Sequence, residues 1–190
     1  NGNDYIENGW ELKDAVRIAP LLEKAGAVYL HISGGVYGST ELTIPSMYTE
    51  QGCFVHLAEE VKKHVTIPVI TVGRIKYPDH ADAIIGEGKA DMVALGRSLL
   101  ADPYYPDKAQ KGDFESIRPC IGCCLGCIHA VLAKEPGSCV VNPDVGREYK
   151  LRDEKMPSQS LKILIAGAGP AGMAAARLFA LNGHTTVVCE

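Results

Sequence analysis

Apolar and polar residues alternate with two different periods along the first 105 residues of the chain. Three segments repeat an apolar residue every three or four positions, as amphipathic helices do, and three short runs between them are almost wholly apolar, as buried strands are. The predicted helices span residues 10–25, 54–65 and 80–86. The predicted strands span residues 27–32, 68–72 and 91–95. Pro20 lies inside the first helical segment, where we expect it to kink or shorten the helix.

This order of elements predicts an α/β fold with a parallel sheet that is covered on both faces. Each helix–strand unit takes roughly the thirty residues of a βα repeat. A complete (β/α)8 barrel needs about 250 residues, so three strands would form only its last part. An open doubly wound sheet is the competing architecture, and the periodicity does not exclude it.

The pattern changes twice further along the chain. Prolines and cysteines interrupt the periodicity over residues 102–159, and the charged residues of 147–155 predict a polar linker. Regular structure resumes at Leu161 with a strand, a glycine turn, a helix and a second strand. We therefore divide the chain into three regions, 1–110, 111–159 and 160–190.

Composition and charge narrow the class of protein. A formal net charge of −4 argues against a partner that is nucleic acid or an anionic membrane surface. No apolar run approaches the roughly 18 residues that span a bilayer, and the polar start at Asn1 does not look like a signal peptide. We expect a soluble, cytoplasmic protein. The chain begins without Met and ends directly after an apolar run, so we also expect a piece of a longer protein, cut inside two domains.

The seven cysteines are unevenly distributed. Cys53 and Cys189 are isolated in apolar surroundings and are expected to be buried thiols. The other five fall within residues 120–139. An odd total without a secretory signal argues against a disulfide framework, whereas local clustering is what metal ligation requires.

The spacing within this group is Cys120-x2-Cys123-x3-Cys127-x11-Cys139. Four thiolates in a compact loop suit a structural zinc ion or an iron–sulfur cluster. Zinc ribbons usually pair two CxxC motifs, whereas three close ligands and one remote ligand are more typical of a [4Fe–4S] loop. Cys124 also forms a CxxC with Cys127, so it could replace Cys123. The structural alternative is a group of buried thiols without a ligand.

A glycine-rich turn follows the strand predicted at 161–166. Gly167, Gly169 and Gly172 form a GxGxxG motif that opens a helix, and the acidic Glu190 follows the third glycine by eighteen positions. In such a turn the glycines permit a tight bend, close approach of a pyrophosphate and close helix–strand packing, while the helix N-terminus faces the phosphate charge. The pattern predicts a dinucleotide site; a glycine turn without a ligand is the alternative.

Two Gly-Arg steps, Gly73-Arg74 and Gly96-Arg97, each end a predicted strand. In a barrel, the loops after the last two strands lie side by side and commonly bind phosphate. Glycine exposes backbone N–H groups, and arginine adds a charged fork of donors. Each step alone would be an ordinary turn with a surface arginine; together they predict a phosphate site.

Taken in order, these features resemble the NADH:flavin oxidoreductases of the old yellow enzyme type that carry an iron–sulfur cluster. That group includes 2,4-dienoyl-CoA reductase, 2-enoate reductase, bile-acid-inducible oxidoreductases and trimethylamine dehydrogenase. The resemblance lies in residues 29–35, 67–74, 90–103, 120–143 and 167–172. It implies that 1–110 is the C-terminal part of an FMN-binding TIM (β/α)8 barrel, 111–159 a [4Fe–4S] cysteine segment with a linker, and 160–190 the start of a Rossmann-like FAD- or NAD(P)-binding domain.

The resemblance also assigns residues. The FMN phosphate site would comprise Gly73, Arg74, Gly96 and Arg97. The [4Fe–4S] ligands would be Cys120, Cys123, Cys127 and Cys139, which leaves Cys124 out. The FAD contacts would be Gly167, Gly169, Gly172 and Glu190. Tyr37 is the nearest match to a histidine that assists protonation in dienoyl-CoA reductase; a tyrosine can donate a proton, and the alternative is a plain loop aromatic. His31 is expected to be a packed strand residue.

The function implied by the resemblance is electron transfer from NAD(P)H to FAD, singly through the cluster to FMN, and from FMN to the activated C=C bond of a small enoate or dienoyl-CoA-type substrate. One alternative is an amine dehydrogenase or demethylase on the same scaffold, and another is a zinc-stabilised nucleotide-binding module. No nucleic-acid or membrane partner is expected, and a homo-oligomer is compatible with the sequence. We expect the fragment alone to be inactive, because three strands of eight leave two unpaired edges.

Overall fold

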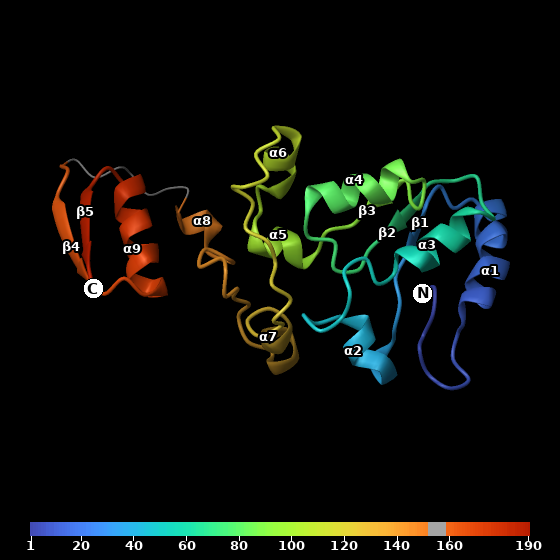
Figure 1. Cartoon of the computed structure of the whole chain (residues 1–190). Coiled ribbons are helices and arrows are strands. Elements are labelled where there is room, and N and C mark those ends of the chain that lie inside the picture. Colours follow the sequence, from blue (N-terminus) through green and yellow to red (C-terminus); the bar gives the residue numbers. More distant parts are fainter. Residues whose placement is uncertain (152–158) are drawn as a thin grey trace. The chain divides into compact units, whose positions relative to one another are not determined.

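The computed structural model describes residues 1–151 and 159–190. The chain divides into two compact units, residues 1–146 and residues 147–190 (Figure 1). Across the described residues, no helix is long and apolar enough to cross a membrane.

The first unit contains a parallel three-stranded sheet in the order β1-β2-β3. Its strands are β1 (Leu30–Ile32), β2 (Val69–Thr71) and β3 (Met92–Val93). The helices that alternate with them are α1 (Leu12–Lys24), α3 (Val55–Lys62) and α4 (Pro78–Gly86). All six predicted elements are present, with strands shorter than expected. Consecutive strands are neighbours, as they are in a (β/α)8 barrel.

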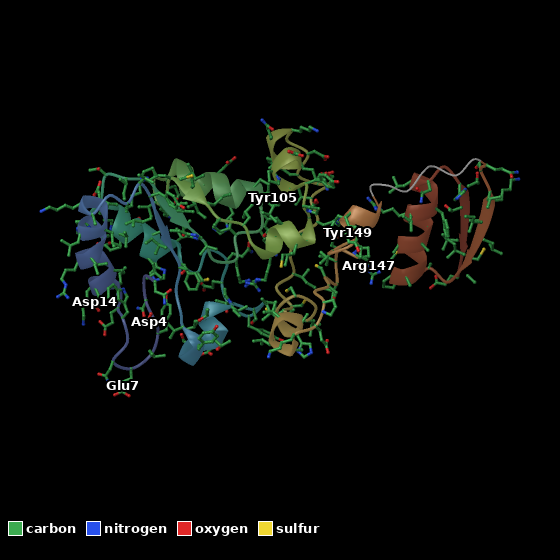
Figure 2. The ribbon with its side chains drawn as sticks, turned by 180° about the vertical axis from the view of Figure 1, so that it is seen from behind. Asp4, Glu7, Asp14, Tyr105, Arg147 and Tyr149 are labelled. Carbon is green, nitrogen blue, oxygen red and sulfur yellow. The ribbon has the colours of Figure 1, made fainter. Side chains whose placement is uncertain are left out.

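Shorter elements occupy the loops of the first unit. They are η1 (Tyr37–Ser39), α2 (Thr40–Thr43), α5 (Arg97–Ala101), α6 (Tyr105–Gln110) and α7 (Ile128–Ala133). Tyr105 is buried at the start of α6 (Figure 2). Near the N-terminus, the carboxylate of Asp4 accepts hydrogen bonds from Asn1 Nδ2 and from the Trp10 backbone N–H, which closes the first loop.

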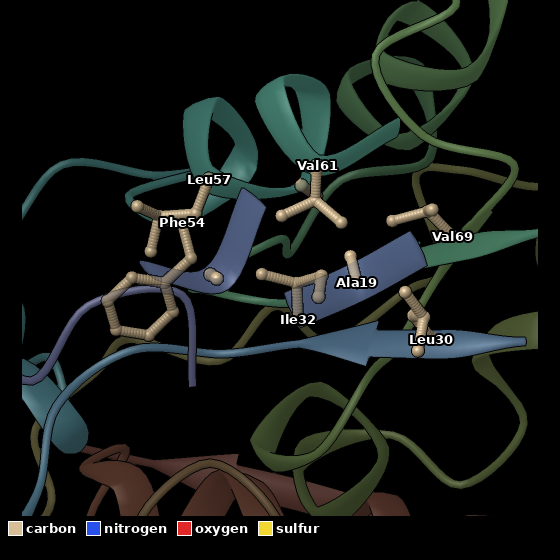
Figure 3. Packing of buried hydrophobic residues seen from close by; sticks show 9 residues of the cluster. Ala19, Leu30, Ile32, Phe54, Leu57, Val61 and Val69 are labelled. Carbon is tan, nitrogen blue, oxygen red and sulfur yellow. The ribbon is translucent and has the colours of Figure 1, made fainter. Parts of the chain in front are cut away.

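The main core lies between the sheet and the helices α1 and α3 (Figure 3). It consists of Ala15, Ala19, Leu30, Ile32, Phe54, Leu57, Ala58, Val61 and Val69. A smaller cluster between α3 and α4 consists of Val55, Ile75, Ala81, Ile84 and Ala90. Complete burial of side chains such as Leu57 and Val61 stabilises the fold by about 2 kcal/mol each.

One alternative for Pro20 is wrong: α1 does not end there but continues to Lys24, and Ala15 and Ala19 of the same helix pack in the core. The alternative of a kink at Pro20 stays a prediction. Within the described residues, β1 is buried on one face only. Since successive side chains of a strand point to opposite faces, Leu30 and Ile32 are buried while His31 is exposed and not packed as expected.

The second unit is a β-α-β arrangement, as the pattern after Leu161 predicts. Its elements are α8 (Glu148–Leu151), β4 (Lys162–Ala166), α9 (Pro170–Leu181) and β5 (Thr185–Cys189). The two strands are parallel, with Lys162 beside Thr185 and Ala166 beside Cys189. Cys189 is exposed rather than buried, because α9 is the one described helix packed on this two-stranded sheet.

Candidate functional site

The carboxyl ends of the three parallel strands share one cavity of about 260 Å³ in the first unit. Ser33 lies just after β1, Gly73-Arg74 after β2 and Gly96-Arg97 after β3, and all line this cavity. The carboxyl edge of a parallel sheet is where ligands of α/β proteins bind, because the loops there are free to vary. The structure thus brings the two Gly-Arg steps together, and their assignment to a phosphate remains a prediction.

The backbone at the first Gly-Arg step is strained. Gly73 has φ +126°, and a Cβ added to it would lie 2.9 Å from Cys53 Sγ and 3.0 Å from the Phe54 backbone nitrogen. No other residue fits there. Arg74 itself is left-handed, with φ +53°, which is uncommon for a residue with a long side chain. Strain of this kind is retained where the surroundings impose it, and it concentrates at functional sites.

Both arginines donate to the loop that follows α2. Arg74 Nη1 lies 3.3 Å from the carbonyl oxygen of Met47, and Arg97 Nη2 lies 2.6 Å from that of Pro45. The other arm of Arg97, Nη1, lies 3.1 Å from Cys124 Sγ. The two guanidinium groups therefore connect the cavity wall to a neighbouring loop and to the cysteine segment. The sequence carried no signal for these contacts, which join residues 27 to 52 positions apart.

Asp102 anchors the start of the cysteine segment. Its side chain is fully buried and accepts hydrogen bonds from Lys108 Nζ at 2.6 Å, the Arg118 backbone N–H at 3.0 Å and the Tyr104 backbone N–H at 3.1 Å. Burial alone would raise the pKa of the Asp102 carboxyl, but these donors stabilise the carboxylate and bring the pKa below its ordinary value. Because Arg118 lies two residues before Cys120, this hydrogen bond fastens the start of the cysteine loop to Asp102, at the C-terminal end of α5. Sequence reasoning missed this residue.

The clustered thiols line a second cavity, next to the first. Its wall contains all five clustered cysteines, with Arg97, Leu100, Ile121, Gly126, Ser138, Val140 and Val141. Each of the five thiol residues is half-buried and none is in a disulfide. The structure therefore gathers Cys120, Cys123, Cys127 and Cys139 around one space, as the spacing predicts, and it places Cys124 there as well. Burial raises the pKa of Cys127.

The remote Cys139 reaches this cavity through two close contacts. Gly126 has no room for a Cβ, which would meet the Ser138 carbonyl oxygen at 2.5 Å, and the Ser138 N–H donates to the Gly126 carbonyl at 2.8 Å. Asn142 is buried, and its Nδ2 donates to the Leu100 carbonyl of α5 at 2.8 Å. Together they hold the segment around residue 139 against the cysteine loop. Sequence reasoning missed Asn142.

The clustered thiols are a donor set of the kind that a [4Fe–4S] cluster takes, and cluster binding remains a prediction. Among the residues that the structure describes, no three His, Cys, Asp or Glu side chains are grouped so that they could hold a metal ion. A [4Fe–4S] cluster takes each thiolate at a separate corner, so its ligands surround a space instead of converging on one ion. The clustered thiols likewise surround a space, since they line an apolar cavity.

In the second unit, the glycine turn has the backbone that its motif requires. Gly167 is left-handed, with φ +105°, and its N–H donates to the Cys189 carbonyl at 2.6 Å. A Cβ on Gly172 would collide with the Gly167 carbonyl oxygen, so only glycine lets α9 begin so close to the turn. Gly169 is the N-cap of α9, with open space where a Cβ would be. Glu190 directly follows β5, at the same edge of the sheet.

Tyr37 is not brought to the cavity of the Gly-Arg steps. Its side chain is fully exposed in η1, and it is absent from the residues that line the cavity. The proposed role in protonation remains a prediction.

Residues 26–115, which contain both Gly-Arg steps, match the sequence profile of the NADH:flavin oxidoreductase / NADH oxidase family. The chain belongs to this family. Among curated relatives, the NADH oxidase of Thermoanaerobacter brockii is 44% identical over 100% of this chain and 29% of its own length. The cinnamate reductase of Clostridium sporogenes is 38% identical over 98% of this chain and 28% of its own.

Amine-oxidising relatives share the same region. The N,N-dimethylglycine/sarcosine dehydrogenase of Chromohalobacter salexigens is 33% identical over 100% of this chain and 28% of its own length.

Among solved structures, a complex of 2-naphthoyl-CoA reductase with 2-naphthoyl-CoA superposes on 99% of this chain and 29% of its own length, with a TM-score of 0.91 and 34% identity. The chain thus spans under a third of the length of these relatives.

Proposed function

We propose that this chain is part of a flavin-dependent oxidoreductase that carries electrons from NAD(P)H to the activated C=C bond of a small enoate or enoyl-CoA-type substrate. The observation that carries the proposal is the adjacency of the two cavities. Arg97 and Cys120 line both the cavity of the Gly-Arg steps and the cavity of the thiols. Such adjacency would suit transfer of electrons between a flavin in one cavity and a cluster in the other.

The three regions of the chain would have separate parts in this function. Residues 1–110 would be the C-terminal part of an FMN-binding TIM barrel, residues 111–159 the [4Fe–4S] segment and linker, and residues 160–190 the start of an FAD- or NAD(P)-binding domain. The consecutive parallel order of β1, β2 and β3 supports the first assignment, and the β-α-β order of the second unit supports the last.

Flavins would supply hydride transfer and a [4Fe–4S] cluster would supply single-electron transfer when they are bound. Arg74 and Arg97 would neutralise the FMN phosphate, and the N–H groups around Gly73 and Gly96 would donate to it. The thiols of Cys120, Cys123, Cys127 and Cys139 would bind the cluster as thiolates. The backbone of Gly167, Gly169 and Gly172 would receive the FAD pyrophosphate at the N-terminus of α9, and Glu190 would accept from a ribose hydroxyl.

The substrate class is proposed from the relatives. One relative is named a cinnamate reductase, and a structural neighbour was solved with a naphthoyl-CoA thioester. Both names describe unsaturated carbon next to a carboxyl or thioester carbonyl. Amine oxidation on the same scaffold is less supported, since the amine dehydrogenase relative is less identical to this chain than the cinnamate reductase is, 33% against 38%.

Metal and flavin content of the full-length protein, purified without oxygen, tests the proposal. We expect about four irons and four acid-labile sulfides per chain, with FMN and FAD bound, and anaerobic reduction of cinnamate or an enoyl-CoA by NADH or NADPH. About one zinc ion and no sulfide would overturn the electron path and favour the zinc-stabilised module. Turnover of a methylated amine without turnover of any enoate would favour the amine dehydrogenase.

A further inference from the structure

Cys124 is the one clustered thiol for which the proposed cluster has no use. It lies between Cys123 and the start of α7, and its backbone is left-handed, with φ +59°. Its carbonyl oxygen accepts from the His129 N–H at 3.1 Å, which ties this strained residue to the first turns of α7. The left-handed backbone therefore sets the direction of the Cys124 side chain.

The sulfur of Cys124 has two hydrogen-bond partners. It accepts from Arg97 Nη1 at 3.1 Å and donates to the Gly122 carbonyl oxygen at 3.6 Å. A neutral thiol can do both, because it has one weak S–H donor and acceptor lone pairs. The Cys124 sulfur therefore faces the Arg97 guanidinium.

Arg97 is held at both arms of its guanidinium group. One arm donates to Cys124 Sγ and the other to the Pro45 carbonyl at 2.6 Å, and the residue lines both cavities. An arginine side chain loses considerable rotamer freedom when it binds a ligand. Holding the fork in place beforehand removes part of that cost, so the ligand binds more tightly.

We propose that Cys124 is a positioning residue of the phosphate site: its thiol orients the Arg97 guanidinium, and so links the cysteine loop to FMN binding. This inference rests on the proposed function, since it takes Arg97 as a ligand of the FMN phosphate. The hydrogen bond between Arg97 and Cys124 then couples two events: the cysteine loop closes around a cluster, and the flavin site becomes preorganised.

The test compares Cys124→Ala with Cys124→Ser in the full-length protein, with Cys189→Ala as the control at an exposed thiol of the second unit. FMN is removed, and its dissociation constant is measured by titration alongside iron and sulfide content. We expect Cys124→Ala to weaken FMN binding about tenfold, the effect of one charge-assisted hydrogen bond, with iron and sulfide unchanged. Cys124→Ser keeps an acceptor for Arg97 and should restore most of the affinity, and Cys189→Ala should match the wild type.

Two results would overturn the inference: loss of iron in Cys124→Ala, which would make Cys124 a ligand, or an FMN affinity within about twofold of wild type. If the alanine variant fails to fold, Cys124→Val fills the thiol's space without an acceptor and carries the same expectation. A wild-type protein without iron or without FMN would contradict the proposed function instead, so the two failures are distinguishable.

Discussion

The two candidate phosphate sites of this chain are built in opposite ways. In the second unit the site is local: six consecutive residues from Gly167 to Gly172 form a turn and the beginning of a helix, and the backbone would do the binding. In the first unit the site is assembled from three loops, and the side chains of Arg74 and Arg97 would do the binding. A site made of backbone groups can be recognised from a sequence motif, because its residues are consecutive. A site made of side chains from separate loops cannot, because it depends on how those loops pack together.

The comparison extends to what holds each site. The turn in the second unit is held by its own sheet, through the hydrogen bond between Gly167 and Cys189. The site in the first unit is held by partners from the loop after α2 and from the cysteine segment. Changes in the cysteine segment should therefore reach the first site and leave the second intact.

The largest expected effect is that of Cys123→Ser. Loss of one thiolate should remove the cluster and abolish NADH-driven turnover. FMN should stay bound but with lower affinity, because its cavity shares Arg97 and Cys120 with the cysteine loop, whereas FAD affinity should not change. Iron, sulfide and flavin content measure this directly. Loss of FAD together with iron would contradict the comparison, and full iron content would mean that Cys124 serves as the ligand.

Gly73→Ala tests whether the strained backbone at Gly73 supports the site of Arg74 and Arg97 in the first unit. The new Cβ would meet Cys53 Sγ and the Phe54 nitrogen at a φ that favours glycine, so we expect a loss of about 3 kcal/mol in the free energy of unfolding and weaker FMN binding. Gly96→Ala is the matched control, because its Cβ meets no described atom within 4 Å, and it should change stability by about 0.5 kcal/mol or less. Denaturant titration compares the two, and equal losses would refute the steric account.

The corresponding pair in the second unit is Gly172→Ala and Gly169→Ala. We expect Gly172→Ala to destabilise this unit by about 2 kcal/mol, because its Cβ would collide with the Gly167 carbonyl oxygen. Gly169→Ala should keep the fold and lose FAD affinity, since it would block only the approach of a pyrophosphate. Thermal unfolding and FAD titration separate these effects, and an unchanged FAD affinity in Gly169→Ala would argue against a backbone site.

The smallest expected effect concerns Asp102, which anchors the cysteine segment. Asp102→Asn should cost about 1.5 kcal/mol, because the donors from Lys108 and Arg118 lose a charged acceptor. The pKa of Asp102 is lowered by folding, so its carboxylate stabilises the fold above the unfolded value of about 3.9, and this stabilisation is lost as the pH falls through the folded value. The difference in stability between wild type and variant should therefore be constant near neutral pH and shrink in acid. A stability difference that grows in acid would show that folding raises the pKa of Asp102 instead of lowering it.

Several features of the fold could be predicted because they depend on local sequence. Periodicity located the three helices and three strands of the first unit, and the run after Leu161 predicted the β-α-β arrangement of the second. The same reasoning was wrong about His31 and about a helix that ends at Pro20, because packing against neighbouring elements decides whether a helix continues and which side chains are buried. Tyr37, chosen by resemblance, lies away from the cavity that the Gly-Arg steps line.

The sequence by itself determined the family, the order of the elements and the candidate ligands, because glycine turns, apolar periodicity and cysteine spacing act over a few residues. Only the tertiary structure decided that Arg97 bridges the loop after α2 and the cysteine segment, that Asp102 and Asn142 anchor that segment, and that Cys124 contacts an arginine. These contacts join residues up to 52 positions apart. These contacts form because the strands of a parallel sheet all end at the same edge. Side chains that are distant in sequence meet there and form hydrogen bonds with one another.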